Sequence, residues 1–174
     1  MKNFELRRHM EEDLRRAIAE EKRLGEFQLA SVVQNSLLTS LSTLAGSPHM
    51  MKITHYATQI AVKSAVVHMN SSTFTVSEAV RGAMHATLNL SGHPMPTAIA
   101  VVTGGLSATH RLDLGRTEAY RKAVVSGIRA AVEDMGLDWE YLRSVIVHLA
   151  KYYPDLTPQP VTQIDGSEEE IVYA

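Results

Sequence analysis

Apolar residues recur every three or four positions along most of the chain, the spacing of helices with one buried face. The first such segment covers residues 3–24, and Gly25 is a suitable stop. A second segment runs from Glu26 to about Leu44, before Gly46-Ser47-Pro48. Two helices joined by one glycine predict an antiparallel hairpin. Its seam would consist of Leu6, Met10, Leu14, Ala17, Ile18 and Leu24 against Phe27, Ala30, Val33, Leu37, Leu41 and Leu44.

The same period predicts four further helices, at about 49–69, 76–90, 115–135 and 139–153. Thr75 and Glu78 have the spacing of a capping box, so we expect the helix over 76–90 to start near Val76. Gly92 would end that helix, and Asp138 would cap the last one.

In residues 91–115 the apolar residues do not recur at a clear helical or strand spacing. Pro94 and Pro96 argue against a regular helix across 93–97, except that Pro96 fits a first helical turn. The apolar run 97–102 is compatible with a short helix or a short strand, and we expect Gly104-Gly105 to end it in either case.

These elements predict a mostly α, single compact domain of about six helices. Residues 1–46 would form the N-terminal hairpin and residues 47–154 the helical core. Residues 155–174 are acidic and poor in apolar residues, so we expect a disordered, flexible tail.

Composition narrows the classes of function. The 174 residues are 45% hydrophobic and 21% charged, which is ordinary for a globular protein. The chain has no cysteine, which excludes disulfides, thiolate zinc sites, iron–sulfur clusters and cysteine nucleophiles. No apolar run reaches about 18 residues and the N-terminus is densely charged, so we expect a cytoplasmic protein without a membrane segment.

The net charge of -2 is unevenly distributed. Residues 1–46 are balanced, with seven basic and seven acidic residues. Residues 47–131 hold eight basic residues against three acidic ones, together with six of the eight histidines. Residues 132–174 hold two basic and nine acidic residues. The basic middle predicts a site for an anionic ligand, unless the acidic tail covers and neutralises it.

Two polar stripes at helical spacing lie in this basic segment. One is Lys52, His55, Gln59 and Lys63, and the other is Arg81, His85 and Asn89. Such stripes present donors to phosphate oxygens from one face of a helix, although each is also compatible with a solvated surface. Further cations that would extend the site are Arg111, Arg116, Arg121 and Lys122.

Patterns for other ligands are weak. The pair Gly104-Gly105 lacks both the G-x-G-x-x-G and the G-x-x-x-x-G-K-[ST] context of nucleotide-binding loops, so a helix end or turn is the better interpretation. No histidines have the H-x-x-x-H or H-E-x-x-H spacing of helical zinc sites. We therefore expect no metal and no cofactor.

The segment Arg143-Ser144-Val145-Ile146-Val147-His148 resembles the R-x4-H motif of the HEPN ribonucleases, which are helical and dimeric. The resemblance implies metal-independent RNA cleavage, with His148 handling protons and Arg143 stabilising phosphate charge. Ser144 departs from the polar Asn or Asp that the family favours. Five residues turn a helix by about 500°, so the two side chains lie about 140° apart and would need a second chain to converge.

The sequence thus favours a binding or regulatory protein over an enzyme. We expect an anionic ligand, a nucleic acid or nucleotide, on the central helices, and a homo-oligomer formed through the apolar hairpin of residues 6–44. Two alternatives stay open: a HEPN-like ribonuclease using Arg143 and His148, and a protein-interaction module that docks the acidic tail ending Ile171-Val172-Tyr173-Ala174 on a partner.

Overall fold

The computed structural model describes residues 3–25, 28–110 and 112–153, and within these ranges it is helical and contains no strand. The elements are α1 (Asn3–Leu24), α2 (Leu29–Leu41), a 3-10 turn (Ser42–Leu44), α3 (Met50–His68), α4 (Thr73–Ser91), α5 (Pro94–Thr109), a second 3-10 turn (Leu114–Arg116), α6 (Thr117–Asp134) and α7 (Trp139–Tyr152). The predicted mostly α class is confirmed, with one more helix than expected.

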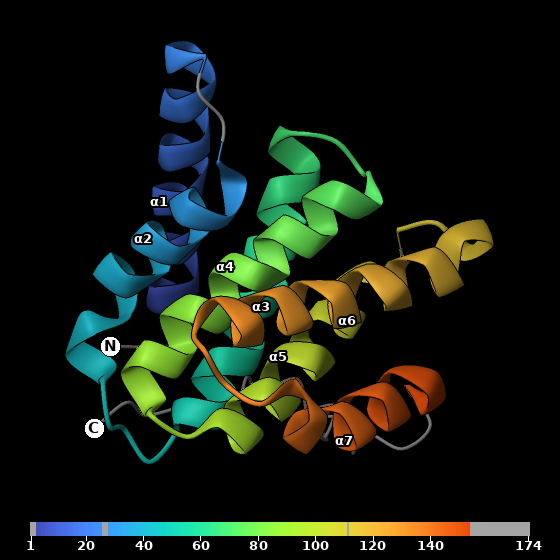
Figure 1. The fold of residues 1–174 in the computed structure, drawn as a ribbon. Helices are drawn as coiled ribbons and strands as arrows, with labels where there is room; N and C mark the ends of the chain where they lie inside the picture. Colours follow the sequence, from blue (N-terminus) through green and yellow to red (C-terminus); the bar gives the residue numbers. More distant parts are fainter. Residues whose placement is uncertain (1–2, 26–27, 111, 154–174) are drawn as a thin grey trace, which may run out of the picture.

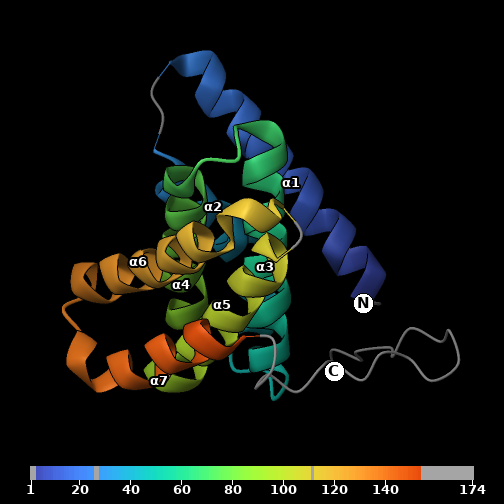
Figure 2. The ribbon, with the colours of Figure 1, turned by 90° about the vertical axis from the view of Figure 1, so that its right-hand side faces the viewer.

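Helices α3, α4 and α5 form the centre of the molecule (Figure 1). The α1–α2 hairpin packs on one side, with α1 against α3 and α2 against α4. Helices α6 and α7 pack on the other side, where α6 contacts α4 and α5, and α7 contacts α5 (Figure 2). One apolar core contains buried residues from each of helices α1 to α7. No described helix is both long and apolar enough to cross a bilayer.

The start of α4 differs from the predicted capping box. The helix begins at Thr73, because the Ser72 hydroxyl accepts a hydrogen bond from the Thr75 amide at 3.1 Å. The Thr75 hydroxyl instead donates to the Asn70 side-chain oxygen at 2.7 Å. Ser72 is therefore the cap, one turn earlier than expected.

Residues 94–109 form one continuous helix, so the expectation that Gly104-Gly105 would end an element is wrong. Both prolines lie in the first turn of α5, where a helix needs no amide donor from them. The two glycines lie in the buried middle of a contact with other helices, where the missing side chains let the chains approach.

Three helix pairs touch backbone to backbone at a glycine. A Cβ atom on Gly82 of α4 would collide with the Ala30 carbonyl oxygen of α2, and one on Gly104 of α5 with the His55 carbonyl oxygen of α3. A Cβ on Gly127 of α6 would collide with the Ser77 carbonyl oxygen of α4. These contacts join both flanking pairs of helices to the centre.

Most of the apolar seam of the N-terminal hairpin is buried inside the chain. Leu6, Met10, Leu14 and Ile18 of α1 are covered, as are Val33, Leu37 and Leu41 of α2. The cover comes from packing of α1 with α2 and α3, and of α2 with α4. Most of the residues that predicted self-association through residues 6–44 therefore already have partners within the chain, whereas Leu24 is 58% exposed and Phe27 lies outside the described residues. The predicted flexible tail, residues 155–174, lies outside the described residues.

The glycine contacts predict the cost of adding one methyl group. Gly82→Ala places a Cβ 2.8 Å from Val33 Cβ and against the Ala30 carbonyl, so α2 and α4 must separate. We expect a loss of about 1–3 kcal/mol in the free energy of unfolding, measured by urea denaturation. Gly115→Ala is the control, because its Cβ would lie at an ordinary 3.4 Å from the nearest atom, Asp113 Oδ1. Equal stability of the two variants would show that the α2–α4 contact is looser than described.

Candidate anionic-ligand site

The predicted cations lie on three helices and have different neighbours. Lys52 and Lys63 are exposed on α3, whereas His55 on the same helix is half-buried. Arg81 and His85 on α4 turn toward α6. Arg116, Arg121 and Lys122 lie at the beginning of α6, and Arg111 lies outside the described residues. We therefore consider the three groups separately.

His55 links α3 to α5 inside the protein. Its Nδ1 lies 2.9 Å from Thr103 Oγ1, and the Thr103 hydroxyl donates to the Ala100 carbonyl oxygen at 3.1 Å. The neutral ring can donate to the Thr103 hydroxyl or accept from it, depending on its tautomer. Burial lowers the pKa of His55. This histidine therefore has the features of a neutral structural residue rather than of a cationic ligand contact.

Arg81 and His85 share one carboxylate, that of Asp134 at the end of α6. The Arg81 guanidinium makes a bidentate contact, with Nε 2.6 Å and a terminal nitrogen 2.8 Å from the two carboxylate oxygens. His85 Nε2 lies 2.9 Å from Asp134 Oδ2, and Glu78 lies 3.4 Å from Arg81. Hydrogen bonds from Arg81, which has the larger effect, and from His85 lower the pKa of Asp134. The cations of this stripe are thus paired within the chain.

Asp134 was not among the predicted residues. Its two partners are 49 and 53 positions away in sequence, so no local spacing marks the contact. The signal that was present is indirect: Asp134 belongs to the acidic segment 132–174, and that segment was expected to neutralise the basic middle if it folded over it.

The third group lies where α5, α6 and α7 come together. Arg121 donates to the carbonyl oxygens of Lys151 and Tyr153 at 3.1 and 2.6 Å, which places a cation at the negative end of the α7 dipole. Tyr153 contacts α5 through the Ser107 hydroxyl, at 2.7 Å, and through the ring of His110. Through Tyr153, the His110 ring, the Ser107 hydroxyl and the Arg121 guanidinium thereby connect the ends of α5, α6 and α7.

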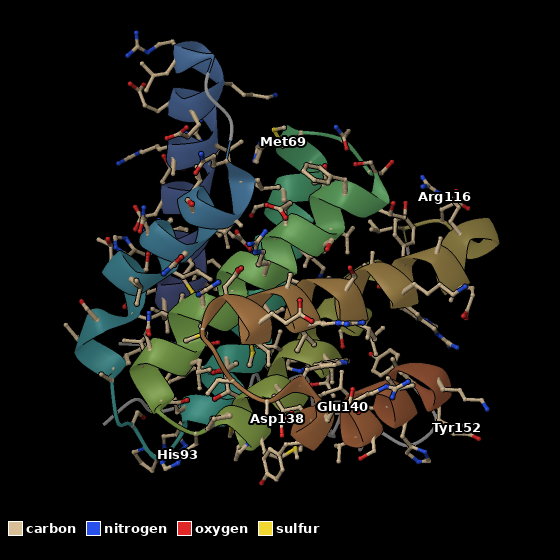
Figure 3. The ribbon with its side chains drawn as sticks, in the orientation of Figure 1. Met69, His93, Arg116, Asp138, Glu140 and Tyr152 are labelled. Atoms are coloured by element: carbon tan, nitrogen blue, oxygen red, sulfur yellow. The ribbon has the colours of Figure 1, made fainter. Side chains whose placement is uncertain are left out.

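Around this junction, the basic end of the molecule consists of His110, Arg116, Arg121, Lys122 and Lys151. The side chains of His110, Arg116, Lys122 and Lys151 are exposed, and Arg121 is half-buried. Arg116 stacks on Tyr120 at 5.1 Å from the ring centroid and contacts the Ser71 carbonyl oxygen at 3.4 Å. Figure 3 shows Arg116 and the exposed Tyr152 on the same side of the molecule, and Figure 2 shows the beginning of α6 and the end of α7 facing the viewer together.

His110, Lys151, Tyr152 and Tyr153 were not among the predicted site residues. The helical period indicated only that the last helix ends near Tyr153. A run of Lys151-Tyr152-Tyr153 at a helix end, with His148 one turn earlier, was the available signal.

Arg143 and His148, the residues of the alternative ribonuclease motif, are both exposed on α7. Arg143 lies 3.5 Å from Glu140, and the His148 ring packs against the Tyr152 ring with centroids 4.7 Å apart. Within one chain they have separate neighbours, as their angular separation predicts.

In the described part of the chain, no group of three or more His, Asp or Glu side chains is placed to hold a metal ion. Comparisons of the chain with protein-family profiles, with curated proteins and with solved structures found no match.

The Asp134 cluster predicts an acid-sensitive contribution to stability. The folded-state pKa of Asp134 is lowered, so its stabilisation is present above the unfolded carboxyl pKa of about 4 and is lost as the pH falls through the folded value. Asp134→Asn should therefore cost about 1 kcal/mol at pH 7 and progressively less in acid. Urea denaturation at several pH values measures both. The neighbouring Glu133→Gln removes only an exposed pair with Arg129 and should have a smaller effect; equal effects would contradict the proposed importance of the cluster.

His55 predicts a second acid-sensitive contribution to stability, of the same sign but nearer neutrality. Its folded-state pKa is lowered, so the unfolded chain takes up a proton first as the pH drops below about 6.5, and stability falls until the folded value is reached. His55→Gln should flatten the stability profile between pH 7 and pH 5. A His55→Gln profile parallel to wild type would show that the ring is not held neutral by burial.

Proposed function

We propose that the protein binds an anionic ligand, a nucleic acid or a nucleotide, at the basic end formed by α5, α6 and α7. The observation that supports this proposal is the junction itself, where cations from separate helix ends gather on one side of the molecule. Among the residues that the structure describes, the charged side chains there are Arg116, Arg121, Lys122 and Lys151 against Asp113 and Glu118. Asp113 is used locally, because its Oδ1 accepts the Gly115 amide at 2.9 Å.

The chemistry of this end suits phosphate with a base attached. Lys122 and Lys151 are exposed ammonium groups that can neutralise phosphate. Tyr152 is 41% exposed and lies beside Lys151, whose Nζ is 5.3 Å from the ring centroid. An aromatic ring next to cations is the combination that proteins use to stack a base while holding its phosphate.

The α4 stripe is a poorer candidate for the same role. A ligand phosphate at Arg81 and His85 would have to displace the bidentate Asp134 carboxylate, which is already an anion of suitable geometry. Lys52 is an exposed lysine on α3, away from the junction of α5, α6 and α7, so it serves as the comparison for Lys122.

Salt dependence and two matched lysine variants test the proposal. Fluorescence anisotropy with a labelled single-stranded oligonucleotide and a labelled mononucleotide, over a series of salt concentrations, measures affinity and its slope. Lys122→Gln should weaken binding and reduce the slope of log K against log salt by about 0.7, the value for one lost contact to a single strand. Lys52→Gln should leave the slope unchanged.

Two outcomes would contradict the proposal. One is the absence of salt-dependent binding to either probe. The other is an equal effect of Lys52→Gln and Lys122→Gln, which would indicate diffuse attraction to the whole surface. Binding of the oligonucleotide but not the mononucleotide would assign the site to a strand, and the reverse would assign it to a free nucleotide.

A further inference from the structure

Helix α7 has an outer face that the rest of the described chain does not cover. Its inner face is buried through Trp139, Leu142, Ile146 and Ala150. On the outer side, the exposed fractions of Tyr141 and Val147 are 65% and 44%, and Tyr152 is also exposed. Val147 lies on the line of the outer face, whereas Tyr141 and Tyr152 are six and five residues from it, about 120° and 140° around the helix, and lie to one side of that line.

The outer face has the spacing of a helix-pairing seam. Its central positions are separated by four, three and four residues, and all are exposed: Glu140, Ser144, Val147 and Lys151. The spacing is that of a line along which two helices can pair, and because three of the four residues are polar, their charges rather than apolar packing determine the arrangement. Tyr141 and His148 flank the seam on one side, at positions where they would extend the contact.

The charges of the seam are complementary to those of its own reversed copy. An antiparallel pair centred between Val145 and Ile146 places Glu140 opposite Lys151 of a second copy, and Ser144 opposite Val147 of that copy. A parallel pair would instead place Glu140 opposite Glu140 and Lys151 opposite Lys151. Because like charges in a seam repel and opposite charges attract, the pattern selects the antiparallel arrangement.

From this pattern we infer that two copies of the protein associate through an antiparallel pair of α7 helices. Such an interface is isologous, as in most homodimers. Glu140 is available for it, because its contact with Arg143 is a single exposed one of 3.5 Å. The inference is independent of the proposed ligand, and Lys151 is the residue that the two surfaces share.

The area that the two α7 helices can bury determines the expected affinity of the dimer. A helix of 14 residues is about 21 Å long, so one helix pair buries less than the roughly 1,200–2,000 Å² of a standard stable interface. The dimer should therefore be weak and dissociate in the micromolar range or above. The apolar hairpin of residues 6–44 takes no part in it.

Charge reversal tests the pairing. Sedimentation velocity over a series of concentrations should show a reversible dimer for the wild-type chain. E140K places two lysines opposite each other and K151E places two glutamates opposite each other, so each should weaken dimerisation at least tenfold. The double variant E140K/K151E exchanges the charges and should restore dimerisation close to the wild-type level.

Two substitutions of exposed valines by aspartate control for general effects of a new surface charge. V147D places a charge in the seam and should abolish the dimer, whereas V67D makes the same change at a 75% exposed position at the end of α3 and should not. Circular dichroism of every variant checks that the helices are intact.

A wild-type chain that stays monomeric, a dimer that persists in V147D, or a double variant that dimerises no better than the single ones would overturn the inference. Loss of oligonucleotide binding on Lys122→Gln concerns the basic end alone, so the two proposals can fail separately.

Discussion

The arrangement of helices α1 to α7 depends on three places where one backbone touches another. At Gly82, Gly104 and Gly127 a neighbouring carbonyl oxygen occupies the space in which any other residue would carry its Cβ. Helices at such short separation bury the small residues of both partners, which explains why α5 is rich in alanine, valine and glycine rather than in leucine. The α1–α2 hairpin and the α6–α7 pair are attached to the centre by contacts of this kind.

The same constraint determines which charges meet. Because α6 crosses α4 at Gly127 and Ser77, the following two turns of α6 bring Asp134 to Arg81 and His85. A stripe that looks cationic in sequence is therefore paired in space. The exposed cations Arg116 and Lys122 lie at the other end of α6 from Asp134. There the ends of α5, α6 and α7 meet, and Arg121 is used to cap the carbonyls of α7.

Most helices were predictable because their buried faces repeat at the helical period, as in α1 and α7. Helix α5 was not, because its apolar residues surround it and its prolines and glycines are usually signs of a break; their role depends on neighbours that local sequence does not reveal. Asp138 as the cap of α7 was predictable from local spacing, and its Oδ1 accepts the Glu140 amide. The contacts of Asp134 and Tyr153 were not, since they join residues about 50 positions apart through the crossing of helices.

Helix α4 makes two of the three glycine contacts, and these lie on nearly opposite sides of it. Ser77 and Gly82 are five residues apart, a rotation of about 140°, so α4 fixes the angle at which α2 and α6 approach the centre. Inserting or deleting one residue between them would turn one contact surface by about 100° relative to the other. The length of this short stretch is thus as strictly constrained as its composition, and homologous chains should vary in length in their loops and tail rather than here.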